Sequence, residues 1–459
     1  MMRTVLKAFL LSAVSFAPSL AWSESLADAL ISAYRNSHLL EQNQAVLRAA
    51  DEDVATAVGS LLPVVSFVSK LSRYAMTNTP SGLESFSSSG SAGLQASLTL
   101  MDFGRGKTTV ALKNELVLAS QAALIGVEQQ VMFDAVQAYV NVALQADLVA
   151  TQESNVKLVS QDLQATEDRF DVGEVTKTDV ALAQAQLASA KAQLVSAEGN
   201  FSLAKERYKA AIGHYPDKVS ALPSRPSAVK SLDEAQAIAL RTHPAMIQAS
   251  HQAKASDLGV DLAKAQMSPT LGLSSSLTNS YSAEGVTKTE TTLGLQMDQT
   301  LYAGGRLSSG LRKAIALQAE ARAGQLQTGV NVSEAVGKAW SNIVVADASI
   351  FATQEQIQAA QAAYDGVKQE ADLGSRTTLD VLNSQQNLLS ANASHLQAQA
   401  NLSISRYGLL AAMGLLTADG LKLGIPTFDP SAYLNAVKKA PATSSRGAKL
   451  DKILKTLGK

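Results

Sequence analysis

The sequence contains one segment twice. Residues 25–67 and residues 231–273 align without a gap at a constant offset of 206, and farther along the chain the offset falls to 201. The duplication extends through about 190 residues per copy, so that the first repeat covers 25–213 and the second covers 231–414. Because tandem repeats are copies of one structural unit, we expect every helix and strand to occur twice and in the same order.

Each repeat contains a very long helical stretch. Residues 105–171 include no proline and hardly a glycine, and apolar residues recur at spacings of three and four throughout. This pattern predicts one helix of 67 residues, which would be about 100 Å long at about 1.5 Å per residue. Residues 306–372 predict the same helix in the second repeat. Such a helix has to bury its apolar stripe against neighbouring helices, so we expect a column rather than a globular domain.

Shorter elements surround each long helix. An amphipathic helix opens each repeat, two strands follow it, and a return helix follows the long helix. The return helix is about half as long as the long helix, so the opening helix covers the other half if the two stack end to end. In the first repeat we predict strands at about 64–76 and 92–103, a loop at 77–91 and a return helix at 179–211. In the second repeat we predict strands at about 270–282 and 290–302 and a return helix at 379–413.

The predicted strands alternate between apolar and polar residues. Leu94, Ala96 and Leu98 share one parity, and Gln95 and Ser97 share the other, as expected of a sheet with one apolar and one polar face. Each strand is long enough to cross a bilayer when tilted. Four strands cannot close a barrel, and open edges are not tolerated in lipid, so several chains must share one. Two chains would give a filled interior, whereas three would give a water-filled lumen.

Composition excludes several classes of function. The formal net charge is −1, which gives no electrostatic case for a nucleic acid partner. The sequence has no cysteine, which excludes disulfides and thiolate metal sites, and its five histidines form no ligand-spaced cluster. The stretch Gly106-Lys107-Thr108 fails as a phosphate-binding loop because Met101 stands where the first glycine is required. We therefore expect no cofactor, no metal site and no enzymatic activity.

The N-terminus has the features of a secretory signal. Arg3 and Lys7 precede an apolar run, and Ser19-Leu20-Ala21 favours cleavage after residue 21, or as late as residue 23. The run is shorter than the ~20 residues that a membrane-spanning helix needs, and no later segment is expected to cross a membrane as a helix. Proline-containing segments follow the repeats, as a linker at 214–230 and a C-terminal segment at 415–459 whose basic end is expected to be mobile.

Both repeats carry a related motif where the long helix gives way to the return helix. The motifs are Arg169-Phe170-Asp171-Val172-Gly173-Glu174-Val175-Thr176-Lys177-Thr178-Asp179-Val180 and Leu373-Gly374-Ser375-Arg376-Thr377-Thr378-Leu379-Asp380-Val381-Leu382. A proline precedes the strands of each repeat, and a glycine-arginine pair follows them. With these features, essentially the whole mature chain resembles the TolC family of outer-membrane channel-tunnel proteins.

The resemblance implies an α+β membrane protein that forms a homotrimer. Its 12-stranded β-barrel, with four strands per chain, would lie in the outer-membrane lipid of a Gram-negative bacterium and continue into a long α-helical barrel in the periplasm. The segments 214–230 and 415–459 would form an equatorial belt. The implied function is the exit duct of a tripartite efflux pump or a type I secretion system, which passively exports small molecules, proteins or both. The implied partners are a periplasmic adaptor and an inner-membrane transporter of the RND or ABC type.

The resemblance also assigns roles to residues at the two tips. The gate and pore mouth would comprise Thr178, Asp179, Arg376, Asp380 and Asn383. The surfaces that dock the adaptor would comprise Val172, Gly173, Glu174, Val175, Leu373, Gly374 and Ser375. Links from Arg376 to Thr178 and Asp179 on the neighbouring tip would hold the entrance closed. Three copies of Asp380 would form an acidic ring that attracts cations.

Simpler interpretations of these residues stay open. Asp179 and Asp380 stand where an aspartate can cap a helix, and Arg376 can merely solvate a turn. Two departures from the family weaken the gate: Ala371 stands at the position of its gating tyrosine, and Asn383 at that of the second pore-mouth aspartate. The alternative function is a periplasmic coiled-coil adaptor, although adaptors lack the two strand hairpins and carry a lipoyl-like segment between their helices.

Overall fold

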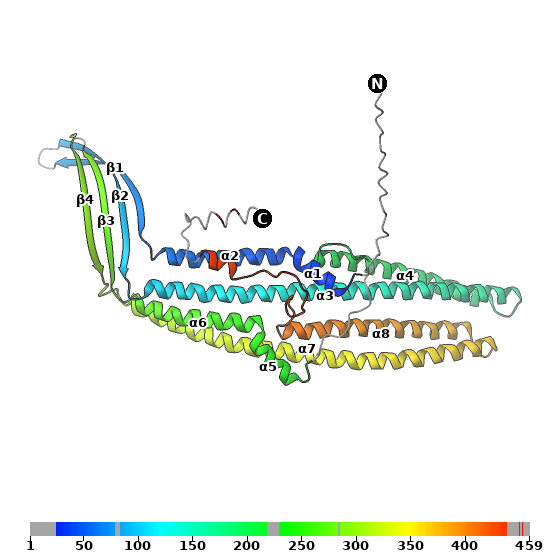
Figure 1. The fold of residues 1–459 in the computed structure, drawn as a ribbon. Helices are drawn as coiled ribbons and strands as arrows, with labels where there is room; N and C mark the ends of the chain where they lie inside the picture. Colours follow the sequence, from blue (N-terminus) through cyan, green and yellow to red (C-terminus); the bar gives the residue numbers. More distant parts are fainter. Residues whose placement is uncertain are drawn as a thin grey trace, which may run out of the picture.

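The protein is a column of long helices with a four-stranded sheet projecting from one end (Figure 1). The structure, a computed structural model, describes residues 24–78, 83–217, 229–282 and 285–437, together with Lys449 and Lys452. The predicted signal peptide lies outside the described residues. So do the middle of the predicted linker and, apart from those two lysines, the basic C-terminal end.

The duplication predicted from the sequence is present in the fold. The first repeat consists of α1 (Leu26–Asn36), α2 (His38–Gly59), β1 (Val64–Asn78), β2 (Leu83–Met101), α3 (Arg105–Asp171) and α4 (Lys177–Ile212). The second consists of α5 (Leu232–Thr242), α6 (Pro244–Ala265), β3 (Thr270–Ser282), β4 (Thr287–Asp298), α7 (Arg306–Asp372) and α8 (Thr378–Ala412). A short helix, α9 (Ala432–Val437), contacts α2. The bounds of α3 and α7 are those predicted.

The strands differ from the prediction at their ends. Residues 83–91, expected within a loop, belong to β2, because their backbones pair with β1 on one side and, from Ser89 onward, with β3 on the other. Pairing with β1 along the whole stretch, and with β3 over its last three residues, overrides the low strand propensity of these serines and Gly90. β2 ends at Met101 rather than 103, since Phe103 and Gly104 have left-handed φ values of 53° and 89°. β4 ends at 298 instead of 302 and begins three residues earlier than predicted.

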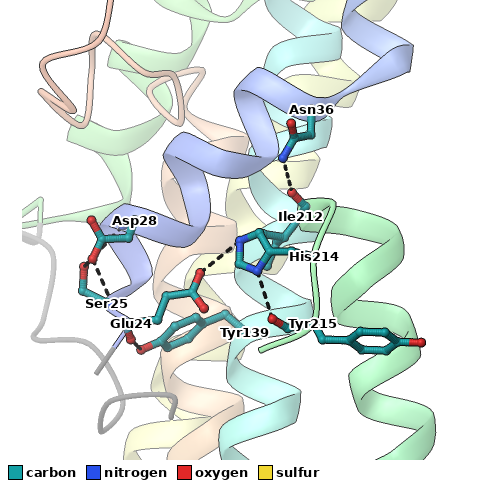
Figure 2. Close-up of polar contacts among 8 residues, drawn as sticks. All are labelled: Glu24, Ser25, Asp28, Asn36, Tyr139, Ile212, His214 and Tyr215. Carbon is teal, nitrogen blue, oxygen red and sulfur yellow. Dashed lines mark hydrogen bonds and ion pairs between the residues drawn. The ribbon is translucent and has the colours of Figure 1, made fainter. Parts of the chain in front are cut away.

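The opening and return helices of each repeat meet end to end, as the length argument predicted. Asn36 Nδ2 at the end of α1 donates a hydrogen bond to the carbonyl oxygen of Ile212, the last residue of α4, at 3.0 Å (Figure 2). At the same position of the second repeat, Thr242 Oγ1 donates to the carbonyl oxygen of Met413 at 2.8 Å. Gly213 follows α4 with a φ of 103°, and a Cβ there would lie 2.6 Å from Asn36 Nδ2. These side chains satisfy carbonyl groups that a helix end leaves unpaired.

The first described residues are fastened to this joint. The carbonyl oxygen of Glu24 accepts a hydrogen bond from Tyr139 Oη of α3 at 3.0 Å, and its carboxylate lies 3.5 Å from His214 Nε2 (Figure 2). Ser25 and Asp28 form a capping box that begins α1. The chain is therefore held against α3 directly after the predicted signal peptide.

The central helix α3 contains the middle of the main core. Met132, Ala135, Val136 and Val140 are 0% exposed there, and α3 contacts α1, α2, α4, α6 and α8. One 18-residue window of α3 reaches a mean hydropathy of 1.3. The expectation that no later segment is apolar enough to cross a membrane was therefore wrong by composition. Only 22% of that window is buried in the single chain, so most of it keeps solvent-accessible surface.

A buried aspartate distinguishes the two repeats. Asp51 on α2 is 0% exposed, and neither of its carboxylate oxygens has a hydrogen-bond partner among the described residues. Its counterpart in the second repeat is Asp257 on α6, at the offset of 206. Asp257 Oδ1 accepts hydrogen bonds from two side chains of α7, Gln318 Nε2 at 2.8 Å and Arg322 Nη2 at 2.9 Å. The same carboxylate is thus paired in one repeat and unpaired in the other.

The first repeat has no cationic side chain at the position that corresponds to Arg322. Gln121 stands at the position of Arg322 and donates its side-chain hydrogen bond to the carbonyl oxygen of Pro430 at 3.2 Å instead. Burial, and to a smaller extent the charge of Glu52, raise the pKa of Asp51 from 3.8 to about 6. The carboxyl group of Asp51 therefore binds a proton more tightly in the folded chain than in the unfolded chain. The stability that the proton contributes is complete below pH 3.8 and is lost as the pH rises through about 6.

We expect Asp51→Asn to increase the free energy of unfolding at pH 7.5 by on the order of 3 kcal/mol and to change it little at pH 4. Asparagine keeps the size of the side chain and removes the cost of a buried charge. Guanidinium unfolding of the purified protein, followed by circular dichroism at both pH values, measures the effect. Asp257→Asn is the matched control and should not stabilise, because it weakens the contact with Arg322. A loss of stability in Asp51→Asn at pH 7.5 would contradict this assignment.

Candidate functional site at the helical tips

The two long hairpins turn at the end of the column opposite the sheet (Figure 1). α3 passes to α4 through residues 172–176, and α7 passes to α8 through residues 373–377. Gly173 and Gly374 both have a φ of 79°, and their N–H groups donate to the carbonyl oxygen three residues earlier at 2.9 and 3.0 Å. Glycine adopts this left-handed conformation without steric cost and commonly ends a helix in this way. The two sequence motifs therefore form the same turn.

A threonine begins each return helix. Thr176 and Asp179 form a capping box on α4, in which Thr176 Oγ1 accepts from the Asp179 N–H at 3.3 Å and Asp179 Oδ2 accepts from the Thr176 N–H at 2.9 Å. Thr377 and Asp380 form the same box on α8, at 3.3 and 3.0 Å. The interpretation of the aspartates as the caps was wrong in detail, because the threonines cap and the aspartates close the box. The boxes also start the return helices one or two residues earlier than predicted.

These hydrogen bonds favour the charged form of both aspartates. The pKa of Asp179 is lowered, chiefly by the side chain of Thr176. The pKa of Asp380 is lowered, chiefly by the backbone N–H of Thr377. Because a carboxyl group with a lowered pKa is ionised at neutral pH, the cap interaction does not compete with a role as a fixed negative charge. Asp380 can do both.

Each tip also contains an ion pair. Arg169 Nε lies 3.4 Å from Glu174 Oε2 on the first tip, and Arg376 Nε lies 2.7 Å from Glu370 Oε2 on the second. At the offset of 201, Arg169 corresponds to Glu370, so the long helix supplies the cation of the pair on the first tip and the anion on the second, whereas Glu174 corresponds to Ser375. The Glu370 carboxylate raises the pKa of Arg376. Because these side chains are largely exposed, each pair alone contributes little to stability.

The two tips line one cavity of about 530 Å³. Arg376 and Asp179, which come from different tips, both line it, and so does Ala371, which is 9% exposed. Ala371, which stands where the resemblance places a gating tyrosine, contributes only a methyl group to the cavity wall. Within the described chain Arg376 bonds to Glu370 rather than to Thr178 or Asp179. The link across the tips therefore stays a prediction.

Three other predicted gate residues lie outside this cavity. Thr178, Asp380 and Asn383 are not part of its lining, and Thr178 and Asn383 are exposed. Asp162 of α3 and Lys368 of α7, which the sequence analysis did not single out, do line it. Burial raises the pKa of Asp162, and the charge of Lys368 opposes that shift. No local motif marks these two residues, because only the packing of different helices brings them together.

The predicted docking residues form the outermost surface of the tips. Val172 is 72% exposed and Leu373 is 85% exposed. Gly173, Glu174, Gly374 and Ser375 are also exposed, whereas Val175 is half-buried and contributes to the cavity wall. Each turn thus presents one apolar side chain and flexible backbone to the surroundings. No group of three or more histidine and acidic side chains that could hold a metal ion occurs within the described ranges.

The model of the outer membrane efflux protein family matches residues 30–214 and 237–415, which is one match on each repeat. The chain belongs to this family. It is 32% identical to the outer membrane efflux protein BepC of Brucella suis over 95% of both chains. It is 24% identical to the outer membrane protein TolC of Escherichia coli, over 94% of this chain and 91% of that protein.

Solved structures share the fold. The CmeC outer membrane channel of Campylobacter jejuni is similar with a TM-score of 0.74 at 18% identity, over 90% of this chain and 89% of CmeC. CusC is similar with a TM-score of 0.76 at 18% identity, over 85% of this chain and 92% of CusC.

Family membership confirms the main predictions. The resemblance to TolC is confirmed, as is the α+β channel fold with long helices and four strands per chain. Relatives in this family are trimeric outer membrane channels, so the protein is an efflux channel of the outer membrane and not an enzyme. The alternative interpretation as a periplasmic adaptor was wrong, because both repeats match a channel family.

Proposed function

We propose that three copies of this chain form the exit duct of a tripartite export machine in a Gram-negative bacterium. A periplasmic adaptor would join the duct to an inner-membrane transporter of the RND or ABC type, and small molecules, proteins or both would pass through it. The observation that carries this proposal is the placement of both tips at one end of the column and of the amphipathic sheet at the other (Figure 1). A duct of this kind is passive, so the transporter supplies the energy.

The sheet supports the proposed trimer because it needs partners at both edges. Its order is β1-β2-β3-β4, so that one edge of β1 and one edge of β4 have no partner strand in the single chain. Unpaired backbone groups are not tolerated in lipid. Three sheets that pair β1 of one chain with β4 of the next close a barrel that is wide enough for a water-filled lumen.

The C-terminal segment supports the proposed equatorial belt. The N–H of Phe428 donates to Tyr34 Oη at 3.1 Å, and Tyr433 Oη donates to Glu52 Oε1 at 2.6 Å. With the bond from Gln121 to Pro430, these contacts hold the segment across α1, α2 and α3. Tyr34 lies two residues before Asn36, at the joint of α1 and α4, and from there the segment continues beside α2 toward the sheet (Figure 1).

The exposed turns of the tips support adaptor docking. Because the sequence has no cysteine, single cysteines can be placed at Glu174 and Ser375. Both side chains are exposed, and neither site has the left-handed backbone that makes Gly173 and Gly374 unsuitable for substitution.

In cells, we expect Glu174→Cys and Ser375→Cys to form cross-links to a periplasmic adaptor, identified by mass spectrometry of the cross-linked band. Ser202→Cys, exposed on α4 and far along the sequence from both tips, is the control and should give little of this product. Cross-linking that is equal at all three sites, or absent from both tips, would exclude the tips as the docking surface.

The shared cavity supports a gate that involves Arg376. We expect Arg376→Ser to raise the conductance of the trimer in planar bilayers severalfold, because Arg376 is the only charged residue of the second turn, 373–377, and lines the same cavity as Asp179 of the first tip. Glu370→Gln is the matched control, since it breaks the pair inside the second tip and leaves Arg376 free to reach the first. We expect its conductance to stay near that of the wild type. An equal increase in both variants would assign closure to the pair inside the tip.

The low pKa of Asp380 supports an acidic ring at the pore mouth. We expect Asp380→Asn to lower the permeability ratio of potassium to chloride, measured from reversal potentials in a salt gradient. Asparagine can still accept the N–H bonds of the capping box, so the turn should persist. Asn383→Asp lies one helical turn farther on and should raise the same ratio. A ratio that Asp380→Asn leaves unchanged would exclude the ring.

A further inference from the structure

The register of the sheet divides its residues between two faces. Residues that are directly paired across strands share a face, and one such row consists of Ser66, Gln95, Ser276 and Thr292. We call this side the polar face. The opposite side, the apolar face, includes Leu71 and Leu293, which are 88% and 74% exposed in the single chain. In a barrel of this type the apolar face contacts lipid and the polar face surrounds the lumen.

Few charged residues occur on the polar face. In the described strands the register places Lys70, Lys288, Glu290 and Asp298 there. Lys288 Nζ lies 2.9 Å from Glu290 Oε2, so these two charges cancel locally. Asp298 is the last residue of β4, next to the helices, and accepts a hydrogen bond from Gln296 Nε2 at 2.9 Å. Asp298 keeps its negative charge, but it lies ten residues along β4 from Lys288, which shares a cross-strand row with Lys70. The uncompensated charge near the middle of the sheet is therefore that of Lys70.

Lys70 stands apart from these charges. It lies near the middle of the 15 residues of β1, opposite Ser91 of β2, and its diagonal neighbours on β2 are Ser89 and Gly93. Its side chain is exposed, and none of the ion pairs among the described residues includes it. Small uncharged neighbours neither neutralise nor cover an ammonium group. A lysine at this position therefore extends into the space that the polar face encloses.

We propose that the three copies of Lys70 form a ring of positive charge inside the barrel, which favours the passage of anionic solutes through the outer part of the duct. The proposal rests on the trimeric duct described above. Fixed charges on the wall of a pore concentrate ions of opposite sign. The screening length is about 10 Å at 0.1 M salt and about 30 Å at 0.01 M, so three ammonium groups in one lumen influence its full width at low salt.

The ring has a direct consequence for conduction. The acidic ring proposed at the tips lies at the opposite end of the duct, so the two ends carry fixed charges of opposite sign. In a pore with such an arrangement, mobile ions accumulate in the lumen under one polarity of the applied voltage and are depleted from it under the other. The current should therefore be asymmetric in voltage at low salt, and loss of either ring should reduce the asymmetry.

The experiment uses the purified full-length trimer in planar bilayers with a gradient of dilute potassium chloride. We expect Lys70→Gln to raise the permeability ratio of potassium to chloride by roughly two-fold and to reduce the voltage asymmetry. Lys70→Arg keeps the charge and should behave as the wild type. Glu290→Gln frees the charge of Lys288 on the same face and should lower the ratio.

Arg73→Gln is the matched control for position. Arg73 lies three residues from Lys70 on the apolar face of β1, where its guanidinium lies 5.2 Å from the ring centre of Phe86. Its loss removes the same charge from the same strand and should leave the ratio unchanged. An unchanged ratio in Lys70→Gln, or an equal shift in Arg73→Gln, would overturn the proposal. A wild-type protein that forms no conducting pore would instead count against the proposed duct itself.

Discussion

The apolar stripe of a 67-residue helix has to be covered along its whole length, and among the described elements only the long helix of the other repeat is long enough to do so alone. The return helix α4 has 36 residues, and α2 covers the part of α3 that α4 does not reach. The opening helices and the return helix together cover the long helix, and hydrogen bonds join them where they meet. Asn36 donates to the carbonyl of Ile212, the last residue of α4, and Thr242 donates to that of Met413, which caps the end of α8. The positions of the sheet and of the tips follow from this solution.

The repeats differ mainly where one helix meets a different neighbour. Asp257 has Arg322 as its partner, whereas Asp51 faces a helix on which glutamine replaces that arginine. In the first repeat the glutamine is used to hold the C-terminal segment, for which the second repeat shows no such contact among the described residues. The ion pairs at the tips also differ, because the first long helix ends with Arg169 where the second has Glu370. The duplication supplies the frame, and single substitutions adapt each copy to its own surroundings.

The sequence predicted those elements whose signal is local. The bounds of α3 and α7 are correct because a long run without proline has clear three- and four-residue periodicity. The start of β2 was missed, because Ser87 to Ser91 have little strand propensity and become a strand through pairing with β1 and, from Ser89 onward, also with β3. The Thr-x-x-Asp pattern at both tips is that of a capping box, but the sequence interpretation placed the caps on the aspartates instead of the threonines.

Other parts of the site could not be read from the sequence. The gate and docking residues were assigned by resemblance, and the single chain does not contain the contacts between chains that their roles require. Glu370 lies six residues before Arg376, a spacing at which a continuous helix gives no contact. The left-handed glycine at 374 reverses the chain and brings the two together at 2.7 Å. The burial of Asp51 and Asp162 likewise depends on which helices pack together.

The two unpaired edges of the sheet make each chain dependent on both of its neighbours. A chain with a damaged β1 or β4 edge would leave a gap that its two intact neighbours cannot close, since each strand has a fixed place in the order. When normal and damaged chains are made in equal amounts and assemble at random, only about one trimer in eight contains three normal chains. Edge defects in this protein should therefore be genetically dominant, whereas defects in a surface loop should be recessive.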